Sequence, residues 1–278
     1  MSKKTLTLSI VIPVYNEQDY LVRCLDAIAK QSQSPDEVIV VDNNSTDSSA
    51  LIAQSYDFVT LLQEPSQGTT FARNSGFQHA TSKIIARIDA DTQIAPDWCE
   101  KLHQIFSNTE VNAVTGPGIL VFVPFLHRIK NTFWVSLYHY GARAYFRHFT
   151  LWGANMAIRK SIWERVKEYT SPQNSLAHED QDISIVLHIL KYKTHYRKDL
   201  LVEAGAERFW NPPKLWKYYR RSLATVKRAK DLQKQVGSKP EPEISIFHAL
   251  IVRVLVWPPM VVFFLLATAY KPFSRRSN

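Results

Sequence analysis

Two carboxylates close an apolar run in this chain of 278 residues: Asp89 and Asp91 flank Ala90 directly after residues 84–88. Carboxylates at the end of a buried strand are costly unless their charge is compensated, and carboxylate oxygens suit Mg²⁺ and Mn²⁺. Residues two apart on an extended segment point to the same side. The pair therefore predicts a metal site. The alternative is a solvated loop before the helix that Pro96 opens.

A second acidic group, Glu179-Asp180-Gln181-Asp182, opens an apolar helical pattern over residues 183–190. Acidic side chains stabilise a helix N-terminus for electrostatic reasons alone, so helix capping is one interpretation. Capping needs a single such residue, however, and here there are three. We therefore expect one carboxylate to take a proton from an attacking hydroxyl. A metal site and a general base are the two functional groups needed to transfer a group from a diphosphate.

The elements that must position these carboxylates alternate along the chain. Apolar β-branched runs predict strands, and apolar residues at helical spacing predict helices. We expect strands over 6–14, 38–41, 58–62, 83–88 and 151–159, and helices over 17–30, 46–52, 69–79, 96–106, 183–190 and 214–234. This alternation predicts an α/β fold with a mostly parallel sheet and helices on both faces. Ligands bind such sheets beyond the carboxyl ends of the strands, so we expect one rim to hold Asn16, Asp42, Asp89 and Asp91.

The amino-acid composition limits the kinds of partner that the protein is expected to bind. The net charge is +9, and the basic residues gather beside aromatic and apolar stretches in the second half. With no nucleic-acid motif, this pattern favours a membrane surface over nucleic acid. Cys24 and Cys99 form no disulfide framework, which predicts a reducing compartment. The basic start meets a run that carries Thr5, Thr7 and Ser9, so we expect a strand there and not an export signal.

The chain divides into a large domain and an apolar end. We predict a catalytic domain over 1–236 with a membrane-facing aromatic and basic insertion at about 120–150, a linker over 237–243, a hydrophobic membrane-associated segment over 244–270 and a basic tail over 271–278. The hydrophobic segment could cross a core of about 30 Å, but Arg253 and Pro258 interrupt it. A single crossing would export one of its two basic flanks, so a re-entrant or interfacial segment is preferred. A buried core helix is the other alternative.

The chain contains five short motifs: Ile12-Pro13-Val14-Tyr15-Asn16-Glu17, Val40-Val41-Asp42-Asn43-Asn44-Ser45-Thr46-Asp47, Arg73-Asn74-Ser75-Gly76, Asp89-Ala90-Asp91 and His178-Glu179-Asp180. Their order and spacing are those of family 2 glycosyltransferases. The chain resembles this family over residues 8–204. The resemblance implies a GT-A fold, a nucleotide-sugar donor, a divalent cation (Mn²⁺ or Mg²⁺) and inversion at the anomeric carbon. The Gln-x-x-Arg-Trp run of processive synthases is missing, which favours transfer of a single sugar over polymer synthesis.

The resemblance also implies site roles on the donor side. Asp91 should hold the metal, and Asp89 the metal or the ribose. The residues expected to bind the nucleotide-sugar are Pro13, Tyr15, Asn16, Glu17, Asp42, Asn44, Arg73, Asp89 and Ala90. Asp42 would contact uracil or another base, although Asp42 and its neighbours could instead build a turn and cap a helix. Arg73 would face the diphosphate, the alternative being a surface arginine.

On the acceptor side, Asp180 is the first choice for the catalytic base and Asp182 the second, with Glu179 positioning the acceptor. Small residues allow close approach, so Trp152, Gly153 and Asn155 are expected to form the acceptor floor. The alternative for these three residues is ordinary strand packing.

The sequence thus predicts a membrane-associated, inverting hexosyltransferase of cell-envelope glycan biosynthesis at the cytoplasmic face, in the inner membrane of a bacterium. A UDP-sugar is a better candidate donor than a GDP-sugar, and the acceptor is a hydroxyl of a lipid-linked or membrane-proximal glycan. One alternative is a polyprenyl-phosphate glycosyltransferase, whose anionic acceptor hardly needs a base. The other is a non-catalytic membrane scaffold on a GT-A fold, against which the intact acidic motifs argue.

Overall fold

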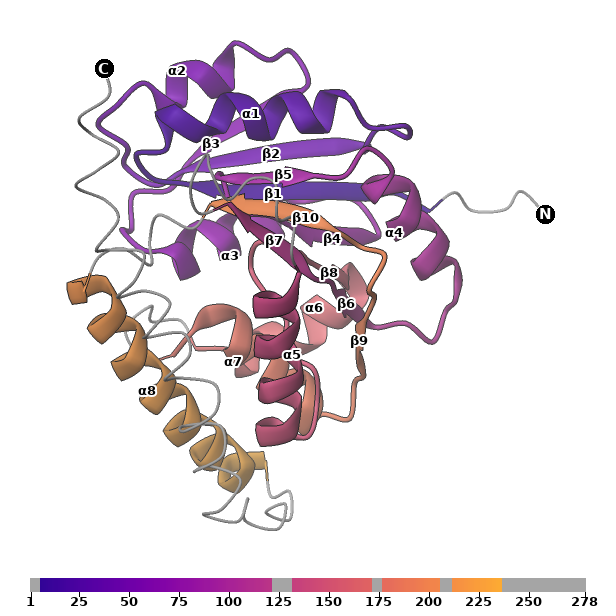
Figure 1. The fold of residues 1–278 in the computed structure, drawn as a ribbon, viewed down its shortest axis with the longest axis vertical. Helices are drawn as coiled ribbons and strands as arrows, with labels where there is room; N and C mark the ends of the chain where they lie inside the picture. Colours follow the sequence, from indigo (N-terminus) through magenta and orange to yellow (C-terminus); the bar gives the residue numbers. More distant parts are fainter. Residues whose placement is uncertain (1–5, 122–131, 172–176, 206–211, 237–278) are drawn as a thin grey trace.

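The computed structural model describes residues 6–121, 132–171, 177–205 and 212–236, whose arrangement is drawn in Figure 1. The elements in chain order are β1 (Leu8–Val14), α1 (Gln18–Ala29), β2 (Glu37–Asp42), α2 (Ser49–Gln54), β3 (Val59–Gln63), α3 (Thr69–His79), β4 (Ile84–Arg87), β5 (Thr92–Ile94), α4 (Trp98–Ser107), β6 (Ala113–Thr115), β7 (Gly118–Val121), α5 (Phe133–Phe146), β8 (Met156–Arg159), α6 (Lys160–Val166), the 3₁₀ helix η2 (Lys167–Tyr169), α7 (Glu179–Ile189), β9 (Thr194–Tyr196), β10 (Val202–Gly205) and α8 (Pro212–Val236). Each predicted strand and helix is present.

The central sheet has seven strands in the order β3-β2-β1-β4-β8-β6-β9. Parallel pairing joins β1 to β2 and β4, β2 to β3, and β6 to β9, while β8 runs antiparallel to both of its neighbours. The predicted mostly parallel sheet is therefore confirmed. The strand expected over 151–159 begins only at Met156, because the Asn155 N–H donates to the Trp152 carbonyl and closes a turn before it.

A second sheet was not predicted. It has three strands in the order β5-β10-β7, with β10 antiparallel to β5 and parallel to β7. These strands are only three or four residues long, which is too short for a periodic signal. The register pairs Ala204 with Thr92, and so brings Gly205 beside Asp91.

Both faces of the central sheet are covered (Figure 1). Helices α1, α2 and α4 pack in one apolar cluster, and α3, α6 and α7 in the other. Along β1, Ile10 and Ile12 enter the first cluster and Val11 the second. Burial on both faces explains why the strands are continuous apolar runs and do not alternate with polar residues. Helix α8 packs against α7 through Leu232.

Several predicted segments lie outside the described residues. They are residues 122–131 of the aromatic insertion, the linker 237–243, the hydrophobic segment 244–270 and the basic tail 271–278. The later part of the insertion forms α5. Within the described ranges, no helix combines the length and apolarity that crossing a bilayer requires.

Candidate active site

A cleft of about 770 Å³ opens beyond the carboxyl ends of β1, β2 and β4 and at the N-termini of α3 and α7. Its lining residues are Pro13, Val14, Tyr15, Asn16, Glu17, Asn43, Gln67, Gly68, Thr69, Ala72, Arg87, Asp89, Ala90, Trp152, Gly153, His178, Glu179, Asp180 and Arg221. This is the rim that a parallel sheet predicts for ligand binding. Most of the residues predicted for the site therefore meet in one cleft.

Asn16 joins the loops that follow β1 and β2. Its backbone is left-handed, with φ 54°, a conformation that asparagine tolerates better than most residues. Asn16 Oδ1 accepts a hydrogen bond from the Thr46 N–H at 2.8 Å, and the Asn16 N–H donates to Ser45 Oγ at 3.1 Å. These bonds fix the loop that presents Tyr15, which is half exposed at the cleft.

Asn43 fixes the loop before α3. Its Oδ1 accepts from the Gly68 N–H at 2.6 Å, and its Nδ2 donates to the Glu64 and Ser66 carbonyls at 2.8 and 2.7 Å. Gly68 has φ 144°, which glycine adopts without strain. The first turn of α3 thereby enters the cleft at Thr69. A helix N-terminus presents free N–H groups and favours an anion such as a diphosphate.

Asp42 and Asn44 stand behind the cleft lining. Asp42 is buried, and its Oδ1 accepts from the Ser45 N–H at 3.2 Å. Asn44 has φ 64° and donates from Nδ2 to the Pro65 carbonyl at 2.7 Å. Both side chains thus support the turn after β2. The predicted contact of Asp42 with a nucleotide base stays a prediction.

Arg87 links β4 to α7 inside the cleft. Its side chain is 3% exposed, and it holds Asp89 Oδ1 at 2.8 Å and Glu179 Oε1 at 2.5 Å. A Cβ on Gly153 would lie 2.6 Å from Arg87 Nη1, so a glycine is needed beside this guanidinium. Glu179 Oε2 is buried, and no residue in the described part of the chain hydrogen-bonds to it. That oxygen is available to a ligand in the cleft.

Asp180 lies at the start of α7 and lines the cleft. Its oxygens accept from the Gly153 N–H at 3.0 Å and the Gln181 N–H at 2.7 Å. Burial, reinforced by the Glu179 charge, raises the pKa of Asp180 to about 7, against the opposing influence of Arg87 and the two N–H groups. A carboxylate with a pKa near the working pH is well suited to act as a general base.

Asp182 points away from the cleft. It is 1% exposed, accepts from the Ser171 N–H at 2.5 Å, and has Oδ1 3.6 Å from Arg228 Nε on α8. The His178 N–H donates to Thr225 Oγ1, also on α8. The second-choice base therefore ties α7 to α8, and Asp180 is the better placed of the two.

Asn155 is separated from the predicted acceptor floor. Its side chain is fully buried, accepts from Trp98 Nε1 at 3.0 Å, and donates to the Pro117 and Leu200 carbonyls. These bonds use both ends of the amide in packing. Trp152 and Gly153 do line the cleft.

Asp89 and Asp91 differ in setting. Asp89 lines the cleft, whereas Asp91 lies against Gly205, where a Cβ would be 2.8 Å from Asp91 Oδ2. The described residues contain no group of three His, Cys, Asp or Glu side chains placed to hold a metal ion. Two hard oxygen donors fit a divalent cation that takes its remaining ligands from a bound diphosphate.

Comparison with known proteins agrees with this geometry. A family model described as Glycosyl transferase family 2 matches residues 9–166. The chain belongs to this family. Among curated relatives, the uncharacterized glycosyltransferase YibD of Escherichia coli is 36% identical over 106 residues, which are 37% of this chain and 31% of YibD. Glycosyltransferase AglE of Haloferax volcanii is 35% identical over 115 residues, or 39% of this chain and 38% of AglE. The chain thus matches about a third of the length of these relatives.

Solved structures share the fold of this family 2 member. The mannosyltransferase PcManGT from Pyrobaculum calidifontis, in complex with GDP-Man and Mn²⁺, has a TM-score of 0.59 at 18% identity, covering 99% of this chain and 89% of PcManGT. TarS from S. aureus, residues 1–349 with UDP-GlcNAc, has a TM-score of 0.57 at 16% identity, covering 95% and 82%. The predicted family and the predicted GT-A-like α/β fold are confirmed.

Some cleft residues of this family 2 chain were not predicted. Arg87 ends a strand that looks purely apolar otherwise, and Arg221 lies in a helix whose charges predict a membrane surface. Gly68 carried a usable signal, because a glycine directly before a helical pattern marks a special backbone at the helix start. Neither arginine carried a comparable local signal.

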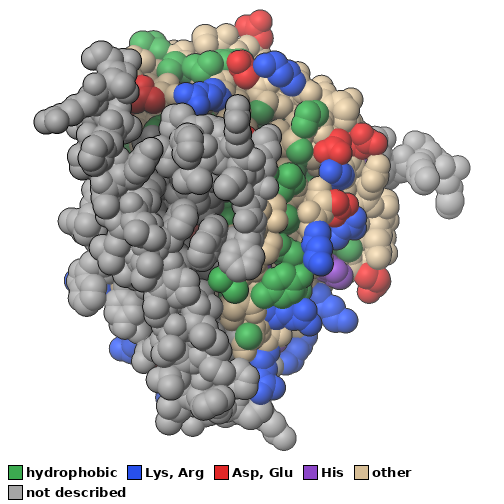
Figure 2. All heavy atoms as spheres, in the orientation of Figure 1, with side chains coloured by type: hydrophobic (Ala, Val, Ile, Leu, Met, Phe, Trp, Pro, Cys, Tyr) green, Lys and Arg blue, Asp and Glu red, His purple; other side chains and the backbone are tan. Residues whose placement is uncertain are grey.

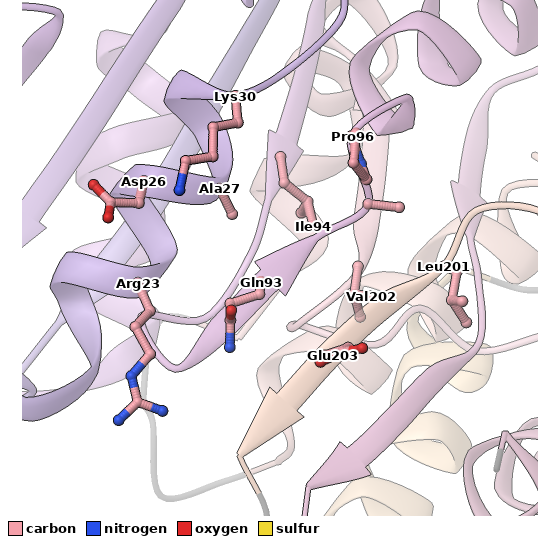
Figure 3. Close-up of a pocket in the computed structure, with 11 residues that line it drawn as sticks. Arg23, Asp26, Ala27, Lys30, Gln93, Ile94, Pro96, Leu201, Val202 and Glu203 are labelled. Carbon is pink, nitrogen blue, oxygen red and sulfur yellow. The ribbon is translucent and has the colours of Figure 1, made fainter. Parts of the chain in front are cut away.

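A second cavity lies away from the cleft. It has a volume of about 490 Å³ and is lined by α1, the β5 segment and β10. Arg23 of α1 and Lys30, directly after α1, line one side of it, and Gln93 and Glu203 line the side of β5 and β10 (Figure 3). No member of the acidic group at 179–182 lines it, so we place the chemistry in the larger cleft.

Proposed function

We propose that the protein transfers one sugar from a nucleotide-sugar to an acceptor hydroxyl, with inversion at the anomeric carbon. The observation that carries this proposal is Asp180, a buried carboxylate with a pKa of about 7 in a cleft that also holds Asp89. An inverting displacement needs one base on the acceptor side and charge stabilisation on the side of the leaving group. The cleft offers both.

The donor half is the part of the cleft built by the loops after β1 and β2 and by the first turn of α3. Tyr15 is half exposed at the cleft and could contact a base or ribose, and the N-terminus of α3 at Thr69 favours the diphosphate. Arg221 adds a cation from α8. A UDP-sugar is the first donor to test and GDP-mannose the second, since both nucleotides occur with solved structures of the same fold.

Asp91 and Asp89 would hold Mn²⁺ or Mg²⁺ together with the donor phosphates. When bound, such a cation neutralises charge that builds on the departing diphosphate. Arg87 keeps the Asp89 carboxylate fixed at 2.8 Å, so this oxygen is oriented before any donor enters.

Asp180 would accept the proton of the attacking hydroxyl. Glu179 Oε2, which no described residue hydrogen-bonds, would accept a hydrogen bond from the acceptor and so orient it. Trp152 and Gly153 would form the floor beneath the acceptor sugar. The Gly153 N–H donates a hydrogen bond to Asp180, so the proposed base is held directly against the proposed floor.

A membrane-proximal acceptor is supported by the surface over α5 and β9. There Phe149 stacks on Tyr196 at 5.0 Å, Tyr140 is 42% exposed, and Arg143 lies 4.7 Å over the Phe149 ring. Figure 2 shows apolar side chains gathered between α5 and β9, with Lys and Arg side chains around them. Aromatic and basic side chains together favour an anionic lipid surface. We therefore propose a membrane-associated enzyme at the cytoplasmic face, with the apolar residues 244–270 as its membrane-associated segment and a lipid-linked or membrane-proximal glycan as acceptor.

The test is a donor panel with the full-length protein in mild detergent and Mn²⁺. We expect one nucleotide-sugar to bind saturably and to release its nucleoside diphosphate when a lipid extract is added as acceptor. The Asp180→Asn variant should bind the same donor without this release. Saturable binding with equal release by both proteins would remove Asp180 from the reaction. Absence of binding for every donor would contradict the proposed function.

A further inference from the structure

Arg73 lies near the middle of α3 and is 0% exposed. Thr69 and Ala72 of the same helix line the cleft, but Arg73 does not. The sequence predicted that Arg73 faces a diphosphate or, alternatively, the solvent. In the structure its side chain reaches neither the cleft lining nor the surface, so its role must be found in the interior.

Packing alone does not explain an arginine at this position. The guanidinium carbon lies 5.2 Å from the Trp163 ring and 5.8 Å from the Phe77 ring. None of its three guanidinium nitrogens has a hydrogen-bond partner among the described residues. A buried guanidinium without hydrogen bonds costs free energy that an apolar side chain of similar length would not cost.

Arg159 provides the contrast within the same chain. Its guanidinium carbon also lies over an aromatic ring, that of Phe106 at 5.2 Å. However, Arg159 donates to the carbonyls of Val111, Phe106 and Asn108. Hydrogen bonds to backbone carbonyls explain why Arg159 is an arginine. Arg73 has no such explanation.

Helices α3 and α7 pack in the same buried cluster, and the charges that act on Arg73 include the carboxylates of the α7 acid cluster, which we define as Glu179, Asp180 and Asp182. Burial lowers the pKa of Arg73 to about 10; Glu179 gives the strongest opposing influence, the Arg87 charge acts in the same direction as burial, and Asp182 and Asp180 add to the opposition. Arg73 therefore stays cationic at neutral pH. Charges in a poorly solvated interior interact over several ångströms without contact.

We propose that Arg73 is a positioning residue, the buried counter-charge of the α7 acid cluster, and that it does not contact the donor. Arg87 already forms an ion pair with Glu179, and Arg228 approaches Asp182 from α8. Neither of these cations is bonded to Asp180 in the described structure. Arg73 supplies positive charge from the α3 side, where packing by Trp163 and Phe77 holds it in place.

Other charged or titratable groups also face the cluster. They are Arg87 and Asp89 at the end of β4, Arg221 and Arg228 on α8, and His178 at the N-terminus of α7. All of them stay unchanged when only Arg73 is substituted. A difference between the wild type and an Arg73 variant therefore isolates the contribution of this one charge.

The deciding experiment is thermal unfolding of the full-length protein between pH 5 and pH 8.5. It compares the wild type with Arg73→Met, Arg73→Lys and the matched control Arg159→Met. Burial raises the folded-state pKa of Asp182, and the Ser171 N–H, Arg228 and Arg73 oppose that rise, so removing the Arg73 charge should raise it further. An acid whose folded pKa is raised lowers the stability progressively as the pH rises from its unfolded pKa to its folded pKa, and a higher folded pKa extends this loss to higher pH. We expect the Arg73→Met deficit in melting temperature to grow by roughly 3 °C or more from pH 5 to pH 8.5.

The two other variants make the result specific. Arg73→Lys keeps the charge and should follow the wild-type pH dependence. Arg159→Met should melt lower by the same amount at every pH, because backbone carbonyls do not titrate. A deficit for Arg73→Met that is equally independent of pH would overturn the proposal and make Arg73 a packing residue.

A second arm rests on the proposed function. Arg73→Met should lower the rate of transfer while leaving the Kd for the nucleoside diphosphate within about twofold of the wild type. A large loss of nucleotide affinity would instead support a donor contact and overturn the proposal. The thermal arm uses no enzymatic activity, so it decides the role of Arg73 even if no donor is turned over.

Discussion

Arg87 and Glu179 are 92 positions apart in the sequence, and their side chains meet at 2.5 Å in a buried ion pair. The same guanidinium holds Asp89 at 2.8 Å. One cation thus joins the end of β4, which carries the predicted metal ligands, to the start of α7, which carries the predicted base. Under the proposed function, Arg87 would therefore connect the donor side of the cleft to the acceptor side.

We predict that Arg87→Met destabilises the fold strongly. Removing the cation leaves Asp89 and Glu179 poorly solvated without their partner, a change that typically costs about 3–5 kcal/mol. Urea unfolding followed by circular dichroism measures the loss. The control is Arg197→Met, which breaks the exposed pair with Asp199, where both side chains are nearly half exposed and the cost is under about 1 kcal/mol. An equal loss of unfolding free energy in the two variants would show that the buried ion pairs of Arg87 stabilise the fold no more than the exposed pair does.

The sequence predicted the elements well where periodicity is long. Helix α3 was expected over 69–79 and spans Thr69–His79, beginning directly after Gly68. The three-stranded sheet was missed because its strands are too short to show a period. Its pairing is set by tertiary contacts, which bring β10 beside a segment more than a hundred residues earlier in the chain.

The sequence predicted most of the residues of the candidate site, but not which way their side chains point. Asp180 and Asp182 are two positions apart on α7, and residues two apart on a helix do not share a face. Only one of them can face the cleft, and the sequence does not say which. Arg73 shows the same limit, because its charge suggests a surface or a ligand while its neighbours on α3 place it in the interior.

We predict that Asp180→Asn lowers transfer by about 10²–10⁴-fold with little effect on donor affinity, because a general base acts in the transition state. Calorimetry with the nucleoside diphosphate and a transfer assay measure the two effects separately. Glu179→Gln serves as the comparison. It should weaken acceptor binding and leave a larger residual rate.

The pH dependence of the wild type should report the same carboxylate. Asp180 must be ionised to accept a proton, and its pKa is about 7 because burial and Glu179 raise it against Arg87 and two backbone N–H groups. The rate should therefore fall as the pH drops below 7, by about tenfold per unit, and level off above it. A profile that stays flat from pH 5 to pH 8 would argue against Asp180 as the base.

We predict that Asp91→Asn nearly abolishes transfer and leaves the melting temperature almost unchanged, because Asp91 is only partly buried and Asn has nearly the same shape. Titration of activity with Mn²⁺ after removal of metal by EDTA is the measurement. Asp97→Asn is the control, since Asp97 pairs with Lys101 on the surface and does not line the cleft. Full turnover of the wild type in EDTA would end the metal hypothesis for Asp89 and Asp91.

The last prediction concerns the membrane. Deleting residues 244–278 should move the protein from the membrane fraction toward the soluble fraction, because an apolar segment and its basic flank are lost together. The shift should be incomplete, since Tyr140, Arg143 and Tyr196 would still contact headgroups, each basic residue contributing about 1 kcal/mol near an anionic surface. High salt should then release the truncated protein but not the full-length one, because salt screens charge and leaves apolar burial in place.

Adding Tyr140→Ser and Arg143→Ser to the deletion should abolish binding to phosphatidylglycerol vesicles. The control pair Lys227→Ser and Lys230→Ser, on exposed positions of α8, should not abolish it. If the full-length chain stays in solution without detergent, the membrane proposal fails. If it sediments with membranes, protease protection of a tag placed after Asn278 distinguishes a single crossing from a re-entrant or interfacial segment.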